Sequence, residues 1–292
     1  MGPTMQKLDV KYRNIEVVPL SGSCGAEIGG VDLSKMISQS VFSEIRQALL
    51  EWQVVFFRDQ RLSSEALKNF AGGFGELDIH TILKGLDGHP EILEVVTAAE
   101  DEHVYAEGWH ADVTYQERPT LGAILYAKEV PEVGGDTLFS NQYMAYEALS
   151  SGMRRLLSGL NAVHSSKYVY GDRQSEMDLK DEYLQVSKAD AQNAESVHPV
   201  VRTHPETGLQ SLFVNDHYTI RFEGMTETES QPLLQYLLLH ATRPEFTCRF
   251  RWERHSIAFW DNRCVLHNPI ADYQGYRRLM HRVVIRGDIP SR

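Results

Sequence analysis

The chain has 292 residues, of which 42% are hydrophobic, and a formal net charge of −11 at pH 7. This apolar fraction is ordinary for a globular protein with a sizeable core. The acidic balance argues against a general nucleic-acid-binding or anionic-membrane-binding surface, and no run of about 20 apolar residues could span a bilayer. We therefore expect neither nucleic acid nor a membrane as a partner.

Cysteine usage and the first residues bear on the cellular compartment. The cysteines, at positions 24, 248 and 264, are scattered and odd in number, which fits reduced thiols. Residues 1–7 contain no apolar stretch of the kind found in signal peptides. Both observations favour a cytoplasmic protein. Cys264 lies close to His267 in sequence, and we interpret it as a small core residue rather than a metal ligand.

The first part of the chain alternates apolar runs with helical patterns. The elements predicted there are a short strand at 14–20, a helix at 41–52, a buried strand at 54–57 and a second helix at 64–71. Ser40 is the expected N-cap of the first helix. Residues 76–106 have no clear pattern, and we expect them to form a lid-like system of loops.

The middle of the chain contains weaker signals. Strands are predicted at 124–127 and at the end of 131–139, followed by helix at 145–160 with a break near Ser151 and Gly152. Residues 171–197 are polar, acidic and poorly patterned. We interpret them as a mobile excursion over the site.

The β pattern returns at residue 198. The elements predicted from there are a hairpin of 198–202 and 210–214, a helix at 226–241, and strands at 246–253, 257–260 and 278–285. Thr226 and Glu229 have the spacing of a capping box, but Pro232 would then lie inside the helix, so Ser230 is the alternative start. Many strands with flanking helices and no β-α-β rhythm favour a mainly β barrel or jelly roll, in a single domain over 1–292.

A His-x-Asp pair, His110 and Asp112, is the first candidate for chemistry. On a strand both side chains would point to the same side and could reach one metal ion. A distant histidine such as His267 would complete a 2-His-1-carboxylate triad, which leaves one face of an octahedral Fe(II) open. In a chain with 12 histidines such a pair also arises by chance, and an exposed or hydrogen-bonded turn is the alternative.

The last predicted strand carries two arginines, Arg278 and Arg282, on one face. Their spacing along an extended strand is roughly 13 Å. Like charges on one face are unfavourable unless each has an anion, so we infer two anion sites inside a barrel. The alternative is an exposed edge strand with solvated arginines. His281 would face the other way and is interpreted as structural.

Five sequence blocks carry a resemblance to a known family, at 109–114, 134–137, 198–204, 260–263 and 278–282. From about residue 15 to 290 the chain resembles the taurine dioxygenase / 2,4-dichlorophenoxyacetate dioxygenase family of Fe(II)- and 2-oxoglutarate-dependent oxygenases. The resemblance implies a double-stranded β-helix (jelly-roll) core. It also implies that dioxygen oxidises the substrate while 2-oxoglutarate becomes succinate and carbon dioxide.

The resemblance assigns roles to the candidate residues. His110, Asp112 and His267 would bind the iron. Thr137 and Arg278 would hold the carboxylates of 2-oxoglutarate, and a guanidinium fork does match a carboxylate bidentately. These implied roles make the metal and co-substrate sites the most specific part of the expectation.

The substrate pocket is implied in the same way. Arg282 matches the position that holds the substrate's anionic group in the taurine enzyme, and Asp261 and Asn262 are expected to support the loop that bears His267. The residues expected to line the pocket are His80, Leu83, Ala106, Val169, Tyr170 and Tyr218. Leu83 and Ala106 replace a tyrosine and an asparagine of the taurine pattern, and an unpartnered buried donor costs about 1–3 kcal/mol.

We therefore expect a small organic anion with an apolar, alkyl or aryl, tail, hydroxylated at carbon next to sulfur or oxygen. Aryloxyalkanoates, alkyl sulfates and sulfonates are such anions. One alternative is a taurine or short-sulfonate dioxygenase, and another is a non-catalytic barrel that binds a metal or a small acid. A homo-oligomer, dimer or tetramer, is also expected.

Overall fold

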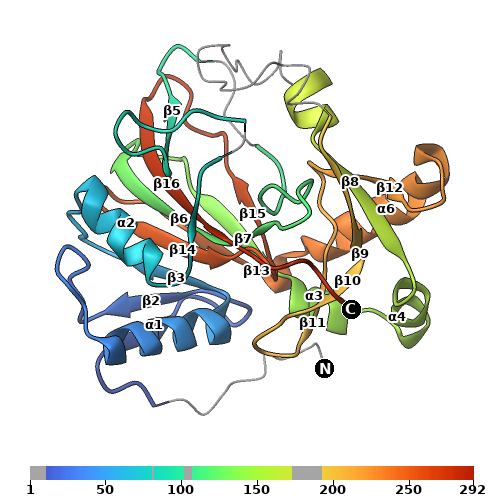
Figure 1. Ribbon diagram of the computed structural model, residues 1–292, viewed down its shortest axis with the longest axis horizontal. Helices are drawn as coiled ribbons and strands as arrows, with labels where there is room; N and C mark the ends of the chain where they lie inside the picture. The colour runs from blue at the N-terminus through green and yellow to red at the C-terminus, as the bar shows by residue number, and fades with distance from the viewer. Residues whose placement is uncertain (1–10, 81, 102–106, 173–192) are drawn as a thin grey trace.

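The computed structural model describes residues 11–80, 82–101, 107–172 and 193–292 (Figure 1). Ala106 and most of the predicted excursion, residues 173–192, lie outside the described residues. In the described part of the chain, no helix is long and apolar enough to cross a membrane.

The larger β layer is an eight-stranded sheet within the described residues, in the order β1-β2-β3-β14-β6-β16-β4, with β5 also paired to β16. Its strands are β1 Glu16–Pro19, β2 Ala26–Gly29, β3 Val54–Phe57, β4 Leu77–Asp78, β5 Ile92–Thr97, β6 Thr120–Glu129, β14 Ile257–Asp261 and β16 Arg278–Arg286. The β16 strand has partners on both sides, so the alternative of an exposed edge strand with solvated arginines was wrong.

A smaller sheet, β13-β7-β15, packs against the larger one. Its strands are β7 Thr137–Asn141, β13 Thr247–Phe250 and β15 Val265–Pro269. Phe56 of β3 stacks on Phe250 of β13 at a centroid distance of 4.0 Å, and Phe139 of β7 lies 5.8 Å from Trp260 of β14. These ring contacts form an apolar core between the two sheets, and the candidate site lies at one end of it.

Two helices, α1 Gln39–Trp52 and α2 Ser64–Gly72, cover the other face of the larger sheet (Figure 1). The alternation along β3 explains why both faces are apolar. Val55 and Phe57 pack with the helices, whereas Val54 and Phe56 belong to the core between the sheets. The continuous apolar run predicted a buried strand, and this prediction is confirmed. Alternate side chains of the strand are buried on opposite faces of the sheet.

The remaining elements form a separate group on the right of Figure 1. They are α3 Gln142–Glu147, α4 Ser151–Leu157, β8 Asn161–Ser165, the π-helix Tyr168–Asp172, β9 Glu195–Pro199, β10 Val201–Thr203, β11 Gln210–Leu212, β12 Thr219–Phe222, α6 Glu227–Ala241 and the 3₁₀ turn Pro244–Phe246. The capping box of Thr226 and Glu229 is present, with Pro232 inside α6, so the alternative start at Ser230 was wrong.

Two helix boundaries differ from the sequence predictions. The N-cap of α1 is Ser38, whose hydroxyl accepts from the backbone N–H of Val41, so the prediction of Ser40 was wrong. The break between α3 and α4 covers 148–150 because the hydroxyl of Ser150 caps α4 by accepting from the N–H of Met153. It therefore precedes the predicted break at Ser151.

Three strand predictions also changed. Residues 92–97 form β5, although the segment 76–106 was expected to be irregular. Its partners in β16 lie 181 to 191 positions further along the chain. The strand at 246–253 is shorter, because only Thr247–Phe250 pairs with β7. His198 and Pro199 pair with β8 instead of continuing the predicted hairpin.

Candidate active site

His110, Asp112 and His267 lie together and are buried. The Nε2 atoms of His110 and His267 lie 3.8 and 3.7 Å from Oδ1 of Asp112. Two donors that bind one ion at about 2.1 Å each are at most about 4.2 Å apart. Both histidine–aspartate pairs are therefore close enough to share an ion.

The backbone holds the two histidines side by side. The N–H of His110 donates to the carbonyl of His267 at 3.0 Å, and the N–H of His267 donates to the carbonyl of His110 at 2.8 Å. The two residues form an isolated bridge and are not part of a longer strand pairing with each other. The Nδ1 of His110 lies 3.0 Å from the carbonyl of Gly108, which can only accept, so the lone pair of this imidazole is on Nε2.

The protonation states of the triad suit a cation. Burial lowers the pKa of His110 to about 3 and that of His267 to about 4, so both rings are neutral near pH 7. Burial alone would raise the pKa of Asp112, but Arg282 and the two histidines outweigh it and lower that pKa to about 2. The Oδ2 of Asp112 is buried and has no hydrogen-bond partner among the described residues. Two neutral imidazoles and an ionised carboxylate with an open oxygen fit a divalent metal.

Arg278 is a buried cation that lacks an anion in the described part of the chain. Its Nε and Nη2 have no hydrogen-bond partner, and burial lowers its pKa. The guanidinium carbon lies 5.8 Å from the ring of Trp252 and 5.9 Å from the ring of Tyr273. A buried guanidinium with unpaired donors is costly unless an anion completes it, so this position fits a carboxylate of a ligand.

Arg282 lies beside the triad. Alternation along β16 puts it on the same face as Arg278 and Met280, toward the core between the sheets. One guanidinium nitrogen of Arg282 is 2.8 Å from Oδ1 of Asp112, so the two form a buried ion pair. His281 faces the other way, as expected, with Nε2 3.4 Å from Glu94.

His80 is buried near Arg282, and its ring orientation is defined. Its Nδ1 accepts the backbone N–H groups of Ile82 and Leu83 at 3.1 and 2.9 Å. Burial and the charge of Arg282 lower its pKa to about 3, so the ring is neutral and the proton is on Nε2. His80 therefore presents an N–H donor on the side away from its own loop.

Four of the expected pocket residues share one buried apolar cluster, namely Leu83, Val169, Tyr170 and Tyr218. The structure adds four residues that the sequence predictions missed: Ile82, Leu93, Val113 and Tyr115. Val113 follows Asp112 directly, and Leu93 of β5 is the cross-strand partner of Arg282. Val113 could have been predicted from the sequence, because it directly follows the His-x-Asp pair. Leu93 could not, because only the pairing of β5 with β16 brings it to the site.

His217 is a further neighbour of the triad that the sequence did not indicate. Its ring is parallel to that of His110, with a centroid distance of 4.3 Å and an interplanar angle of 6°. Its Nε2 lies 2.8 Å from the carbonyl of Glu107, so it carries the proton. This stacking fixes the ring plane of His110.

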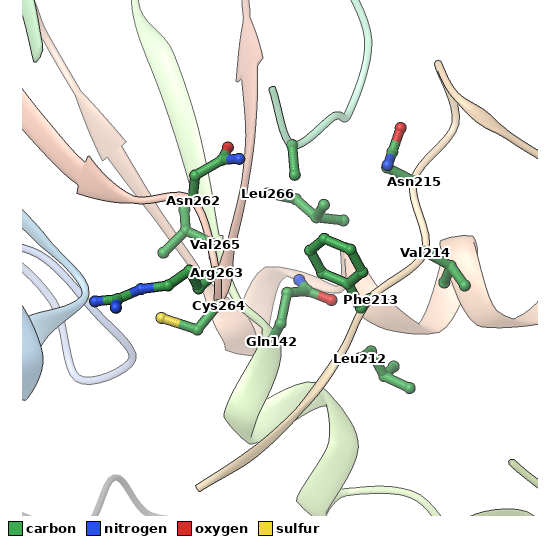
Figure 2. Close-up of a pocket in the computed structure, with 11 residues that line it drawn as sticks. Gln142, Leu212, Phe213, Val214, Asn215, Asn262, Arg263, Cys264, Val265 and Leu266 are labelled. Atoms are coloured by element: carbon green, nitrogen blue, oxygen red, sulfur yellow. The ribbon is translucent and has the colours of Figure 1, made fainter. Parts of the chain in front are cut away.

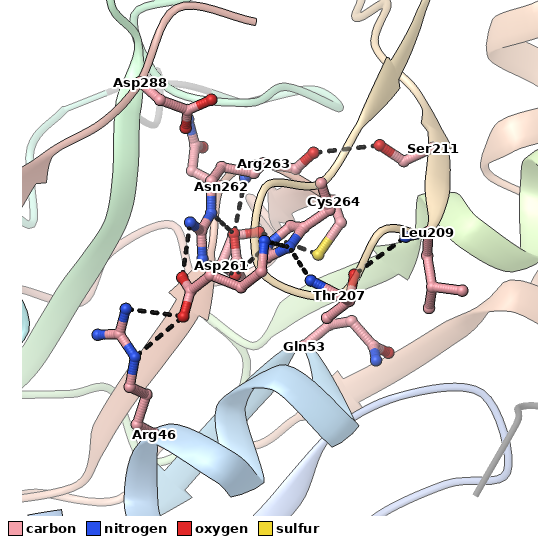
Figure 3. A network of polar contacts seen from close by, with 12 residues as sticks. Arg46, Gln53, Thr207, Leu209, Ser211, Asp261, Asn262, Arg263, Cys264 and Asp288 are labelled. Carbon is pink, nitrogen blue, oxygen red and sulfur yellow. Dashed lines mark hydrogen bonds and ion pairs between the residues drawn. The ribbon is translucent and has the colours of Figure 1, made fainter. Parts of the chain in front are cut away.

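Asn262 and Asp261 act differently from each other. The Oδ1 of Asn262 accepts from the N–H of Asp112 at 2.7 Å, and its Nδ2 donates to the carbonyl of Asp112 at 3.0 Å. Asn262 therefore holds Asp112, where the sequence suggested support for the loop of His267. Asp261 instead accepts from Arg263 at 2.8 and 2.6 Å and lies 3.0 Å from His204 (Figure 3).

A second group, His204, Asp261 and Cys264, also has metal-binding residue types close together. Asp261 is already satisfied, because Arg263 pairs with both of its oxygens and lowers its pKa against the effect of burial. Burial raises the pKa of the Cys264 thiol, which opposes thiolate formation. We therefore interpret this group as structural, in line with the expectation for Cys264.

Figure 2 shows a narrow pocket that has no room for a water molecule. It is lined by Ala111, Gln142, Leu212, Phe213, Val214, Asn215, Asn262, Arg263, Cys264, Val265 and Leu266. Ala111 and Leu266 are chain neighbours of the triad, but none of the triad residues lines the pocket. This pocket is therefore not part of the candidate site.

Comparison with known proteins supports this assignment of chemistry. Residues 16–284 match the family described as "Taurine catabolism dioxygenase TauD, TfdA family". The alpha-ketoglutarate-dependent sulfate ester dioxygenase of Pseudomonas putida is 35% identical over 277 residues, which cover 94% of this chain and 91% of that protein. Alpha-ketoglutarate is another name for 2-oxoglutarate.

Solved structures agree with the sequence match. The crystal structure of a taurine dioxygenase from Burkholderia xenovorans has a TM-score of 0.79 at 38% identity, over 95% of this chain and 93% of that chain. The crystal structure of AAD-2 in complex with Mn(II) and N-oxalylglycine has a TM-score of 0.78 at 26% identity, over 96% and 100% of the two chains. The chain belongs to the TauD/TfdA family of 2-oxoglutarate-dependent dioxygenases.

Proposed function

We propose that His110, Asp112 and His267 hold one Fe(II), at which this dioxygenase oxidises a small organic anion with an apolar tail. The observation that carries the proposal is the buried triad with neutral histidines and an open Asp112 oxygen. When bound, the iron with 2-oxoglutarate and dioxygen supplies the oxidant for a C–H bond and releases succinate and carbon dioxide. The protein's residues position the reactants and exclude water.

We place the distal carboxylate of 2-oxoglutarate at Arg278, with the hydroxyl of Thr137 beside it. The open Nε and Nη2 of Arg278 support this placement, because they can donate to two carboxylate oxygens in parallel. Thr137 is buried and connects to Arg278 through Trp252, whose indole N–H donates to its hydroxyl. The triad and Arg278 would then bind opposite ends of the co-substrate.

Arg282, His80 and the apolar cluster would hold the prime substrate. Arg282 now balances the negative charge of Asp112. A divalent metal ion at Asp112 would balance that charge instead, and Arg282 would then pair with the anionic group of the substrate. The N–H of His80 is a second donor for that group. The tail would contact Leu83 and Tyr218, where burial contributes about 25 cal/mol per Å² of apolar area.

This arrangement favours sulfate esters, sulfonates or aryloxyalkanoates with an alkyl or aryl tail, oxidised at the carbon next to sulfur or oxygen. The sulfate ester dioxygenase of Pseudomonas putida supports the first class. Taurine is the competing candidate, because His80 and Arg282 would serve its sulfonate equally. Its ammonium group, however, would meet the side chain of Leu83, which offers no acceptor.

We further propose that the two facing sheets form a double-stranded β-helix core and that the chain is a single domain. The smaller sheet β13-β7-β15 packs on β3, β14, β6 and β16 of the larger one, with the triad at one end, which supports this description. Self-association into a dimer or tetramer and a cytoplasmic location stay predictions from the sequence.

Competition between substrates tests the pocket. Purified enzyme with Fe(II) and 2-oxoglutarate receives taurine together with a medium-chain alkyl sulfate, an alkanesulfonate or a phenoxypropionate, and each product is quantified. We expect a substrate with an apolar tail to have the higher kcat/KM. Taurine winning every competition would contradict the pocket assignment, and no succinate with any substrate would favour a non-catalytic barrel.

A further inference from the structure

Trp252 makes a directional hydrogen bond to the proposed co-substrate residue Thr137. Its Nε1–H donates to Oγ1 of Thr137 at 2.9 Å, and both side chains are buried. Thr137 is the cross-strand partner of Phe250, so Trp252 lies just beyond the end of β13 and reaches back to the first residue of β7. The contact therefore depends on the register of these two strands.

The indole is held in place and packs beside Arg278. Phe250 contacts the Trp252 ring edge-to-face at 4.9 Å and 83°. Arg278 lies near the rings of both Trp252 and Tyr273, and the hydroxyl of Tyr273 is 3.0 Å from Oγ1 of Thr97. Each ring beside the guanidinium is thus tied through its polar atom to a threonine hydroxyl.

We propose that Trp252 is a positioning residue for 2-oxoglutarate, acting through the hydroxyl of Thr137. The inference rests on the proposed placement of the co-substrate at Arg278 and Thr137. An indole N–H can only donate, so Oγ1 of Thr137 must act as the acceptor in this bond. The hydroxyl proton of Thr137 is then directed to another acceptor, and the carboxylate at Arg278 provides it.

The bond therefore selects one of the rotamers of the hydroxyl proton before the co-substrate binds. Without the indole donor, the hydroxyl would be free to turn, and part of its contribution to binding would be lost as rotational entropy and as a competing orientation. A hydrogen bond of this kind changes binding by roughly three- to tenfold. The effect should fall on 2-oxoglutarate and leave the prime substrate unaffected.

A double-mutant cycle tests this coupling. The variants are Trp252→Phe, Thr137→Val and the double substitution, and calorimetry measures the Kd with which the Mn(II)-loaded protein binds 2-oxoglutarate. We expect Trp252→Phe to raise this Kd roughly three- to tenfold, and the double variant to bind like Thr137→Val alone. In steady state, the KM for the co-substrate should rise while kcat and the KM for the prime substrate hold.

Trp52→Phe is the matched control, because the indole nitrogen of Trp52 is also buried but has no hydrogen-bond partner in the part of the chain that the structure describes. It should leave the Kd unchanged. Should Trp252→Phe reduce stability, benzothienylalanine in place of tryptophan removes the donor while keeping the ring size. The same rise in Kd is expected with it.

The outcomes distinguish the placement of the co-substrate from the positioning role of Trp252. An unchanged Kd in Thr137→Val would overturn the placement of the co-substrate, and the inference with it. A raised Kd in Thr137→Val with an unchanged Kd in Trp252→Phe would overturn only the positioning role. The same conclusion would follow if the fold-increases in Kd of the two single variants multiplied in the double variant. Equal rises in KM for both substrates would indicate a general loss of structure and also contradict the proposal.

Discussion

Asp112 and Arg278 are buried ionic side chains that the described residues leave incompletely satisfied. Oδ2 of Asp112 and two nitrogens of Arg278 lack hydrogen-bond partners. Buried polar atoms are nearly always paired in folded proteins, and exceptions require an explanation. Here one of the two groups is an anionic carboxylate and the other a cationic guanidinium. A cation at Asp112 and an anion at Arg278 explain both, and the metal and the 2-oxoglutarate of this family have these charges.

Asn262 supplies a test at the scale of one residue. Its amide satisfies both backbone groups of Asp112, so Asn262→Ala should loosen the carboxylate without removing it. We expect metal affinity to fall by about ten- to a hundredfold, as for residues that orient a ligand. Titration of the metal-free protein with Mn(II) measures this loss.

The control is Asn161→Ala, because Asn161 donates to Glu223 at an exposed position. This variant should bind Mn(II) like the wild type. Unchanged affinity in Asn262→Ala would show that the amide does not position Asp112.

At the scale of elements, β16 organises the site. Its alternation directs Arg278 and Arg282 to one side, and pairing with β5 and β6 buries both. Arg278 lies near the rings of Trp252 and Tyr273, whereas Arg282 pairs with Asp112. The two arginines should therefore bind different anions. The strand would thus separate the co-substrate from the prime substrate.

Matched substitutions on β16 test this separation. Arg278→Gln should raise the KM for the co-substrate by roughly ten- to a hundredfold, the effect of losing a charge-assisted pair. Arg282→Gln should raise mainly the KM for the prime substrate. Steady-state kinetics with each reactant varied in turn measures both ratios, and equal losses for both reactants in either variant would contradict the division.

The sequence predicted the elements that depend on residues close together in the chain, and it missed those that depend on distant residues. The capping box of Thr226 and Glu229 and the alternation of β16 are encoded within a few residues, and the structure has both. The β5 strand was missed because its sequence does not alternate and its pairing partner is distant. For the same reason the bridge between His110 and His267 was not predicted, although the two residues were matched as candidates.

The pocket shows the same limit. The resemblance to the family implied Val169, Tyr170 and Tyr218 as pocket residues, and the structure has them in one apolar cluster. Leu93 could not be predicted, because it enters the site only through the register that sets it opposite Arg282. The stacking of His217 on His110 likewise arises from the folding of a distant loop.

At the scale of the whole molecule, buried neutral histidines link stability to pH. His164 is fully buried, and burial together with the nearby His198 lowers its pKa well below 6.5. Its unfolded pKa is about 6.5, so the unfolded chain takes up a proton that the folded protein does not. This contribution is present above pH 6.5 and is lost as pH falls, because the depressed pKa belongs to the folded state.

We therefore expect the metal-free protein to lose stability between pH 7.5 and 5.5, with about 1 kcal/mol of the loss due to His164. His80, whose pKa is about 3, adds to it in the same direction. In His164→Asn, whose side chain can still form a hydrogen bond with Thr114, the loss over this interval should be smaller. Urea unfolding at both pH values measures the difference, and an identical pH dependence in the variant would contradict the assignment.

The most direct test of the central claim combines iron content with succinate formation in Asp112→Ala. The wild type should bind one Fe(II) per chain and convert 2-oxoglutarate to succinate in the presence of substrate. Asp112→Ala should bind little iron and form no succinate above background, whereas Asp32→Ala, at an exposed ion pair with Lys35, should match the wild type. A folded Asp112→Ala with stoichiometric iron and wild-type turnover would contradict the account.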